Sequence, residues 1–408
     1  MNILVSSSKL FFPYLSVMLA SLYESHNYGE LCVYLLHKEL DTTDLNILQS
    51  QATSSGNRVI PIQIDEKELY SLPTRMQWPL VLYYRLSLVE VLPESVDRIL
   101  SLDVDLVVRK PLNSLYESNL EGVYVAACED LNFNTRRYKQ GIGLPNDCSY
   151  FNAGVMLFHV SKLREDNIRL KRFLDEAEQL TGHLTFLDQD LLNVVFREKV
   201  RLERAEYYNC SPALYDNKSG SIAAQHPNYA SIIHYLGHDQ KPWDTFIGEP
   251  GSELQEIWWN YARQTSFYPK IKEDFDKKYL KILANQNIVL KKYYGVAIKW
   301  LSIEDRVYKL EQYFLQRNVQ RVAGYGINLL QSIFVSDLQK SKIQLAYLID
   351  SYATGYAYGL EIKRGTQYTD IDAIIVVAFP HYSEICEGIE ASCDVLSLEE
   401  IIEEIYRW

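Results

Sequence analysis

The chain has 408 residues, of which 47% are hydrophobic and 23% are charged, and its formal net charge is −12 at pH 7. This length exceeds what a single core usually supports, so we expect a globular protein of more than one domain. The acidic balance argues against nucleic acid as a partner, because phosphate backbones attract basic surfaces.

Short apolar runs alternate with helical patterns through the first part of the chain, which is typical of an α/β fold. We expect helices at residues 15–22, 45–51 and 84–92, and strands at residues 3–5, 31–36, 59–64, 98–102, 123–127, 151–158 and 232–235. Ligands of open α/β sheets bind beyond the carboxyl ends of the strands. The serines at 6–8 and the acids Asp103 and Asp105 lie at such strand ends, so both groups are candidates for one ligand site.

The pattern changes near residue 266, where helical stretches rich in lysine, tyrosine and leucine begin. We expect helices at residues 270–283, 289–301 and 303–315. A second α/β rhythm follows, with strands at 322–325, 344–349 and 373–378 and helices at 328–338 and 396–406. The chain is therefore predicted to comprise a catalytic domain (1–265), a helical bridge (266–318) and a small Rossmann-like domain (319–408).

Two carboxylates lie two residues apart directly after the expected strand at 98–102. Side chains alternate along an extended chain, so Asp103 and Asp105 should point the same way. Like charges held together raise each other's pKa unless a cation neutralises them. A divalent metal ion that links the pair to a substrate diphosphate explains the pattern, and a solvated strand end is the alternative.

A histidine, His234, lies near the end of the later expected strand at 232–235. Gly237 follows it and allows close backbone approach to a ligand, and Lys241 offers a compact cation for phosphate. These residues indicate a diphosphate site, with an ordinary packed histidine as the alternative. An imidazole ligand favours Mn²⁺ over Mg²⁺, and we keep Mg²⁺ as an alternative.

Further sequence blocks accompany the acids and the histidine. In chain order, the blocks are residues 98–111 (RILSLDVDLVVRKP), 150–158 (YFNAGVMLF), 186–193 (FLDQDLLN) and 234–243 (HYLGHDQKPW). With these blocks the chain resembles glycosyltransferase family 8, which includes bacterial lipopolysaccharide galactosyltransferases and glycogenin. The blocks occur in the order of that family, and the resemblance covers roughly residues 1–262.

The resemblance implies a GT-A fold, a UDP-sugar donor, Mn²⁺ and transfer with retention of anomeric configuration. It implies Asp103, Asp105 and His234 as metal ligands and Gln189, Asp188 and Asp130 as catalytic residues, with Gln189 beneath the anomeric carbon. The donor-binding residues that it implies are Ser6, Ser8, Phe11, Arg85, Asp103, Val104, Asp105, Asn152, Ala153, Asp188, Gln189, His234, Gly237 and Lys241.

The first loop departs from the family pattern. Ser8 stands where the family has an acid, and Phe11 stands where it has a tyrosine. An aromatic ring can still stack on a base, so a donor-binding role is still expected there. The spacing from His234 to Lys241 is one residue longer than the commonest family spacing, which puts the role of Lys241 in question.

The expected strand at 322–325 carries Gly324 and leads to Gly326, and this pair faintly resembles a dinucleotide-binding fingerprint. The third glycine of the fingerprint would fall at Leu329 and is absent. Cofactor binding there, and with it a nucleotide-sugar oxidoreductase, is therefore a weaker alternative to a structural or docking role. The bridge, with lysines, tyrosines and Trp300, is expected to pack as helices, and peripheral membrane contact is the alternative.

These observations predict an enzyme that moves a hexose from UDP-galactose, or from UDP-glucose, to a glycan acceptor. We expect the acceptor to be an O-glycan on a serine-rich protein or a cell-surface polysaccharide or lipooligosaccharide. A catalytically weak UDP-sugar-binding module or a partner subunit is the alternative. The sequence shows neither a signal-peptide pattern nor an apolar run long enough for a membrane span, so we expect a cytoplasmic protein.

Overall fold

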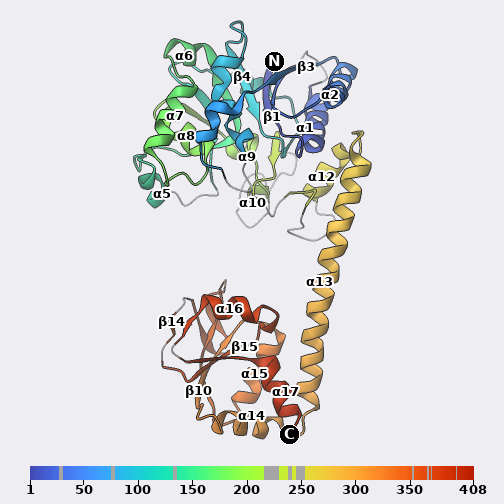
Figure 1. The fold of residues 1–408 in the computed structure, drawn as a ribbon. Coiled ribbons are helices and arrows are strands. Elements are labelled where there is room, and N and C mark those ends of the chain that lie inside the picture. Colours follow the sequence, from blue (N-terminus) through green and yellow to red (C-terminus); the bar gives the residue numbers. More distant parts are fainter. Residues whose placement is uncertain are drawn as a thin grey trace. The chain divides into compact units, whose positions relative to one another are not determined.

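The computed structural model describes residues 1–26, 31–74, 79–131, 136–215, 229–237, 241–244, 253–351, 353–364, 367–368, 370–391 and 393–408. The chain divides into two compact units, Met1–Lys278 and Tyr279–Trp408. Figure 1 labels the helices and strands of each unit. The boundary between the units falls inside the long helix α13 (Tyr268–Ser302). The predicted division at residues 265 and 318 stays a prediction.

A mixed seven-stranded sheet forms the centre of the first unit, in the order β3-β2-β1-β4-β7-β6-β8. Strands β3, β2, β1 and β4 are parallel, and β7 runs antiparallel to both β4 and β6. The described strands of this unit are β1 (Asn2–Ser6), β2 (Cys32–His37), β3 (Arg58–Gln63), β4 (Arg98–Leu102), β5 (Leu106–Val108), β6 (Val125–Glu129), β7 (Phe151–His159), β8 (Val200–Glu203) and β9 (Ile232–His234).

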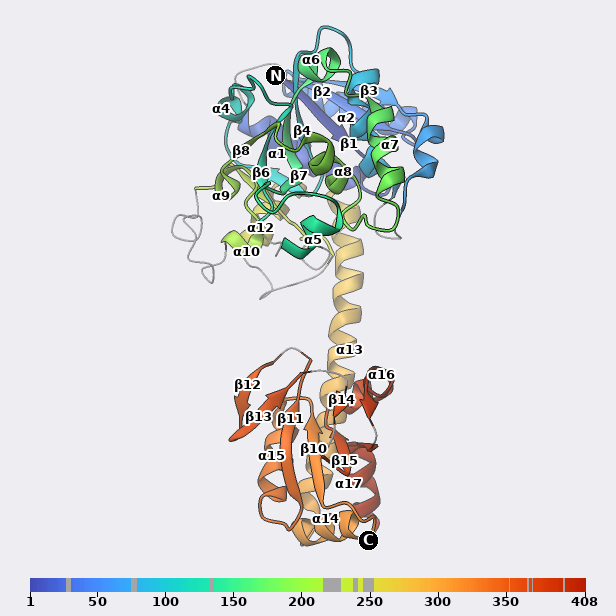
Figure 2. The same ribbon diagram turned by 90° about the vertical axis from the view of Figure 1, so that its left-hand side faces the viewer.

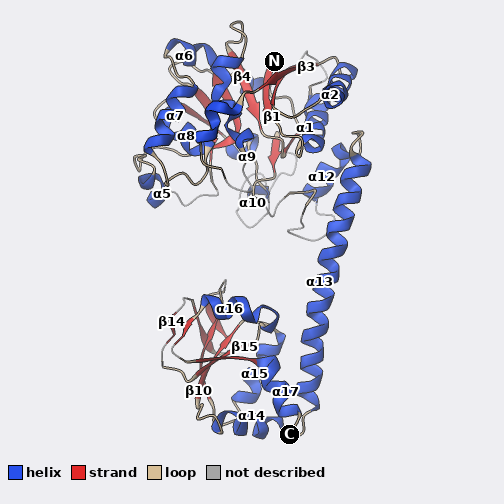
Figure 3. Cartoon of the chain, in the orientation of Figure 1, coloured by secondary structure: helices blue, strands red, loops and turns tan. Residues whose placement is uncertain are grey.

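Alternation along the strands buries both faces of this sheet. Leu4 of β1 lies in one hydrophobic cluster, and its neighbours Ile3 and Val5 lie in another on the opposite face. Helices α7 and α8 contribute to the first cluster, and α1 and α2 contribute to the second. Figure 3 shows the strands of this unit between helices, as the α/β pattern of the sequence predicted.

The helices of the first unit cover the sheet and carry its loops. They are α1 (Phe12–Ser25), α2 (Thr42–Ser54), α3 (Leu88–Val91), α4 (Asn113–Tyr116), α5 (Arg136–Gly141), α6 (Val160–Glu165), α7 (Leu170–Gln179), α8 (Asp188–Phe196), α9 (Ala205–Tyr208), α10 (Pro212–Tyr215) and α12 (Glu253–Ala262), with 3-10 helices η1 (Glu66–Ser71) and η2 (Leu80–Ser87).

Three predicted helices differ in the structure. The helix expected at 84–92 is a 3-10 helix, η2, followed by the short α3, and η2 buries the consecutive residues 83–87. The helices expected at 270–283 and 289–301 form one continuous helix, α13, because no proline or helix-ending cap interrupts residues 284–288.

A six-stranded sheet forms the centre of the C-terminal unit, with the strand order β12-β13-β11-β10-β15-β17. It is parallel except for β12, and Figure 2 shows its strands face on. The described elements are β10 (Arg321–Tyr325), β11 (Gln344–Ile349), β12 (Gly355–Ala357), β13 (Leu360–Lys363), β14 (Gln367–Tyr368), β15 (Ala373–Val376), β16 (Glu390–Ala391), β17 (Asp394–Ser397), α14 (Arg306–Leu315), α15 (Leu329–Leu338), η5 (Phe379–His381), α16 (Tyr382–Gly388) and α17 (Leu398–Tyr406).

The Gly-x-Gly segment of this unit lies at the carboxyl end of β10. The buried side chain of Gln331 fills the space beside Gly324, so a side chain at 324 would collide with it. Asn328 caps α15 by accepting a hydrogen bond from the Gln331 N–H at 3.0 Å. These contacts give the segment a structural role in packing helix against strand.

The aromatic residues of the predicted bridge pack in part against the C-terminal core. Trp300 of α13 is buried and donates a hydrogen bond from its indole to Asp337 at 2.8 Å. Tyr293 packs against Phe379 with ring centroids 4.7 Å apart. Within the residues that the structure describes, no helix has the length and apolar character to span a membrane.

Candidate active site

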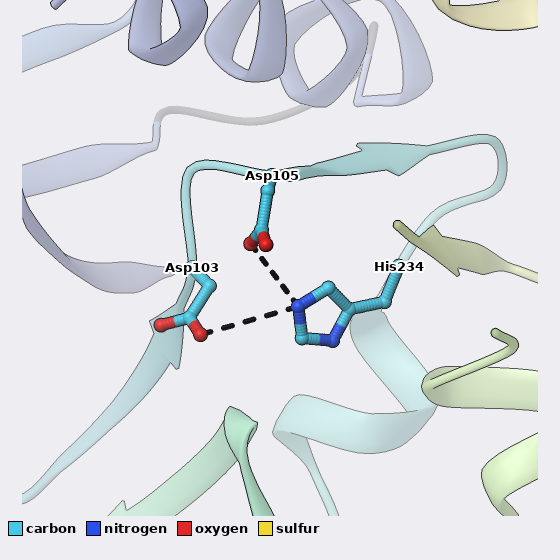
Figure 4. A group of neighbouring side chains, drawn as sticks. All are labelled: Asp103, Asp105 and His234. Carbon is cyan, nitrogen blue, oxygen red and sulfur yellow. Dashed lines mark hydrogen bonds and ion pairs between the residues drawn. The ribbon is translucent and has the colours of Figure 1, made fainter. Parts of the chain in front are cut away.

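Three segments from different parts of the chain meet at the carboxyl edge of the first sheet. Asp103 follows β4 and donates its backbone N–H to the Gly154 carbonyl of β7 at 2.9 Å. Strand β5 pairs with β9 in antiparallel register, which places Leu106 opposite His234. This pairing brings His234 beside the carboxylates, and Figure 4 shows the three side chains directed into a common space.

The side chains of Asp103, Asp105 and His234 offer ligand atoms that lie within 4.8 Å of one another. The imidazole Nε2 is 3.1 Å from an Asp105 carboxylate oxygen and 4.0 Å from an Asp103 oxygen. His234 is buried, whereas both acids are half-buried. Two carboxylates and one imidazole form a donor set that suits a divalent cation such as Mn²⁺ or Mg²⁺.

Glycine at position 154 gives the imidazole its space. A Cβ on Gly154 would overlap Cε1 of His234 and lie 2.7 Å from Nδ1 of the same ring, closer than real side chains approach, and Oδ1 of Asn152 would be 3.0 Å away. The strand β7 therefore supports the histidine ring with bare backbone. The same glycine holds the Asp103 backbone through its carbonyl.

A cation pairs with each of the two acids: Lys241 with Asp105, and Arg85 with Asp103. Lys241 forms an ion pair with Asp105 and donates to the Tyr235 carbonyl at 2.7 Å. Burial alone would raise the pKa of Asp105, but Lys241 and His234 outweigh it and hold that pKa well below its usual range. Asp105 is therefore ionised at neutral pH.

The buried guanidinium of Arg85 joins the acids to α8. It bonds to Asp103 and to the Ala153 carbonyl, and its Nε lies 3.4 Å from Asp188. Burial alone would lower the pKa of Arg85, but the charges of Asp103 and Asp188 outweigh it and raise that pKa. For Asp188, burial dominates over the nearby guanidinium and raises the pKa to about 7.

A line of amides continues from this group. Gln189 accepts a hydrogen bond from the Ala153 N–H at 3.0 Å and one from the Asn152 side chain at 3.2 Å. Its own amide N–H donates to Asp130 at 3.1 Å. The acid at 130 and the amides at 152 and 189 thus form a connected polar surface, which suits recognition of the hydroxyl groups of a sugar.

The sequence model of Glycosyl transferase family 8 matches residues 2–246 of the chain, which is more than half of its length. The chain belongs to this family. A putative glycosyltransferase of Haemophilus influenzae is 25% identical over 67% of this chain and 86% of its own, and a lipopolysaccharide 1,2-glucosyltransferase of Escherichia coli is 27% identical over 56% of this chain and 68% of its own.

A solved structure of the galactosyltransferase LgtC in complex with donor and acceptor sugar analogues is also similar. It has a TM-score of 0.58 and 24% identity, and the match covers 65% of this chain and 96% of that one. This likeness shows that the family member described here has the GT-A fold, as its sequence predicted. The second α/β unit is an addition to that fold.

A small pocket lies beside the side-chain amide of Asn152 in this glycosyltransferase. It is lined by Glu129, Asp130, Leu131, Asn152, Ala205, Asn209, Leu214 and Leu236. Sequence reasoning identified Asp130 and Asn152 of this set and missed the others. Leu131 and Leu214 are in irregular or short segments, so no periodic pattern placed them at a site.

Asn209 is a missed residue that bonds to two members of the site. Its side chain bonds to Nδ1 of His234 at 2.7 Å and donates to Asn152 at 3.0 Å. It is buried and follows α9, in a stretch of sequence that carries no motif. Only the fold places it between the two.

Other predicted donor-binding residues lie near the ends of strands β1, β4 and β9. Ser6 ends β1, which runs parallel to β4, and Ser8 follows it. Phe11 precedes α1 and packs edge-on against Tyr14. Val104 lies between the two acids, and Gly237 follows β9 with a φ of 85° that favours glycine. Their roles stay predictions.

Proposed function

We propose that this protein is a retaining glycosyltransferase that moves a hexose, galactose in preference to glucose, from a UDP-sugar to a glycan acceptor. The observation that carries the proposal is the meeting of Asp103, Asp105 and His234 beside the polar surface of Asp130, Asn152 and Gln189. Membership of the family and the sugar-transfer names of its relatives support it.

The acids and the imidazole would hold a divalent ion, and the imidazole ligand leads us to favour Mn²⁺. When bound, the ion would neutralise negative charge on the donor diphosphate. Lys241 and Arg85 supply further positive charge at this edge, and Lys241 would pass from Asp105 to a phosphate oxygen. Fixed cations of this kind favour the departure of UDP because they act where its charge develops.

Asp130, Asn152 and Asp188 would hold the hydroxyl groups of the hexose, and Gln189 would lie beneath its anomeric carbon. An amide is a poor nucleophile, so we favour attack on the same face from which UDP departs. The acceptor oxygen then bonds to the anomeric carbon while the bond between that carbon and the phosphate oxygen of UDP breaks. The acceptor proton passes to the departing phosphate oxygen, which balances the reaction without a covalent enzyme intermediate.

We propose a glycan acceptor, either an O-glycan on a serine-rich protein or a cell-surface polysaccharide or lipooligosaccharide. The E. coli relative is named for lipopolysaccharide, and the LgtC structure holds an acceptor sugar analogue, which supports a sugar rather than a small alcohol. The pocket beside Asp130 and Asn209 is the place where we expect the two sugars to meet.

The test is a panel of UDP-sugars with Mn²⁺ and glycan acceptors, with UDP release as the measurement. We expect UDP-galactose to be the best donor, Asp103→Ala to abolish release, and the exposed-acid control Asp65→Ala to retain it. If UDP binds but no sugar is transferred or hydrolysed, the protein is a binding module and the proposal is wrong. A glycosyl adduct trapped on Gln189 or Asp190 would reject the same-face attack.

A further inference from the structure

Backbone N–H groups fix the orientation of the amide side chains beside the acids. The Gly154 N–H can only donate, and it bonds to Asn152 at 2.9 Å, so the Asn152 atom that it meets must be the carbonyl oxygen. Asn209 contacts this same oxygen at 3.0 Å. Asn209 must therefore present its NH₂ group to Asn152.

The orientation of Asn209 then determines the tautomer of His234. With its NH₂ directed at Asn152, Asn209 turns its carbonyl oxygen toward Nδ1 of His234 at 2.7 Å. A carbonyl oxygen only accepts, so Nδ1 carries the proton. In the neutral ring the lone pair is then on Nε2, the atom that lies 3.1 Å from Asp105 and 4.0 Å from Asp103.

A second backbone donor orients the neighbouring amide independently. The Ala153 N–H bonds to Gln189 at 3.0 Å and fixes the carbonyl oxygen of that side chain. Asn152 donates its NH₂ to the same oxygen at 3.2 Å, which agrees with the orientation set by Gly154. The consecutive backbone N–H groups of Ala153 and Gly154 in β7 thus orient the side chains of Gln189 and Asn152. Through Asn209, the same strand also orients the ring of His234.

The backbone around Asn209 is held rigidly against β9. Its N–H bonds to the Ala205 carbonyl at 2.8 Å, and the next residue, Cys210, forms a β-bridge with Ile233. Asn209 is 3% exposed and His234 is 1% exposed. Water therefore has little access to replace a lost hydrogen bond between them.

We infer that Asn209 is a positioning residue, which holds His234 in the tautomer that directs Nε2 at the metal site and couples that site to Asn152. The inference rests on the proposed function, because it assigns Asn209 to the metal and donor sites of that reaction. Partners of this kind keep the ring orientation and the basicity of a metal-binding histidine, and their loss typically costs about 10- to 100-fold in metal affinity.

The two hydrogen bonds of Asn209 can be separated by substitution. Asn209→Ala removes both, so we expect Mn²⁺ affinity to fall about 10- to 100-fold. Asn209→Asp keeps an oxygen for Nδ1 of His234 but loses the donor to Asn152. For this variant we expect Mn²⁺ affinity within about threefold of wild type, together with a rise of roughly tenfold in the KM for the UDP-sugar.

The measurement is titration of the full chain with Mn²⁺ in the presence of UDP, with free Mn²⁺ followed by electron paramagnetic resonance. Asn57→Ala is the matched control, because Asn57 is also a buried asparagine of the first unit and bonds to backbone at Leu31 and Ser55. Circular dichroism and melting temperature report folding in each variant. A general loss of stability would affect Asn57→Ala and Asn209→Ala alike.

Equal Mn²⁺ affinity in wild type and Asn209→Ala would overturn the inference and leave the proposed function standing. Equal losses in Asn209→Asp and Asn209→Ala would also overturn it, because the acceptor for Nδ1 would then have no separate effect. Wild-type protein that binds UDP but no Mn²⁺ would reject the metal site of the proposed function and this inference with it.

Discussion

A methyl group added at Gly154 tests the geometry of the site directly. The Cβ of Gly154→Ala would overlap Cε1 of His234, which lies nearer to it than Nδ1 at 2.7 Å, and ordinary contact begins at 3.4 Å. The ring or the strand must therefore move by about 1 Å or more, since overpacked cores respond by shifting. His234 is buried and bonded to Asn209, so movement of the ring breaks that bond.

Overpacking of this kind costs about 1–3 kcal/mol of the free energy of unfolding. Displacement of a catalytic group by nearly 1 Å costs roughly 100-fold in rate, so we expect kcat/KM for the UDP-sugar to fall by about that factor. Urea unfolding measures the first quantity, and initial rates of UDP release measure the second. Gly295→Ala is the control, because its added methyl meets no heavy atom within 4 Å.

A double-mutant cycle assigns the stability cost to the imidazole. In a His234→Ala background the added methyl has no ring to meet and only the contact to Asn152 at 3.0 Å is left, so the cost of Gly154→Ala should fall to less than half in the unfolding measurement. Retention of kcat/KM within twofold of wild type by Gly154→Ala would show that His234 is not displaced. An unchanged stability cost when His234 is absent would show that the imidazole is not the group that the methyl meets.

Three further substitutions test the groups around the acids. Arg85→Lys should lower kcat/KM roughly 10- to 100-fold in steady-state kinetics, because one ammonium cannot replace the guanidinium contacts to Asp103 and Asp188; a loss below threefold would contradict this. Because the folded pKa of Asp188 is about 7 against an ordinary 3.8, the folded protein binds this proton more tightly than the unfolded chain, and stability falls as pH rises toward 7. Asp188→Asn should therefore gain about 3 kcal/mol relative to wild type between pH 5 and pH 8 in urea unfolding, and a constant difference would show that the pKa is ordinary. Asp190→Ala should cost about 3 kcal/mol in the same measurement, because it removes the hydrogen bonds that Asp190 accepts from the Tyr150 hydroxyl and from two backbone N–H groups; a loss below 1 kcal/mol would refute that account.

Local pattern predicted the long central strands and the main helices on either side of them, but it missed elements such as β5, α7 and α8. Apolar residues point to both faces of the sheet in the strands expected at 3–5, 31–36 and 98–102, because helices cover both faces. Continuous apolar runs of this kind can be recognised in the sequence. Element ends were harder to place. The helix expected at 84–92 is replaced by the end of the 3-10 helix η2 and the short α3. Consecutive residues of η2 contact several elements at once, which is a property of packing and not of periodicity.

The sequence by itself determined that Asp103 and Asp105 lie on one short segment after a buried strand. It also offered His234, Gly237 and Lys241 as a second polar group near the end of another strand. No local signal joins residues that are 129 positions apart, as Asp105 and His234 are. The antiparallel pairing of β5 with β9 joins them, and it depends on the whole first unit being folded.

The tertiary structure alone decided the surroundings of these groups. Asn209 has no motif, because an asparagine can serve as a turn, cap or core residue and its neighbours in sequence do not distinguish these roles. Its position between His234 and Asn152 follows from the bridge that ties Cys210 to Ile233. The need for glycine at 154 likewise arises from a ring 80 residues away in the chain, which enters its space only in the folded protein.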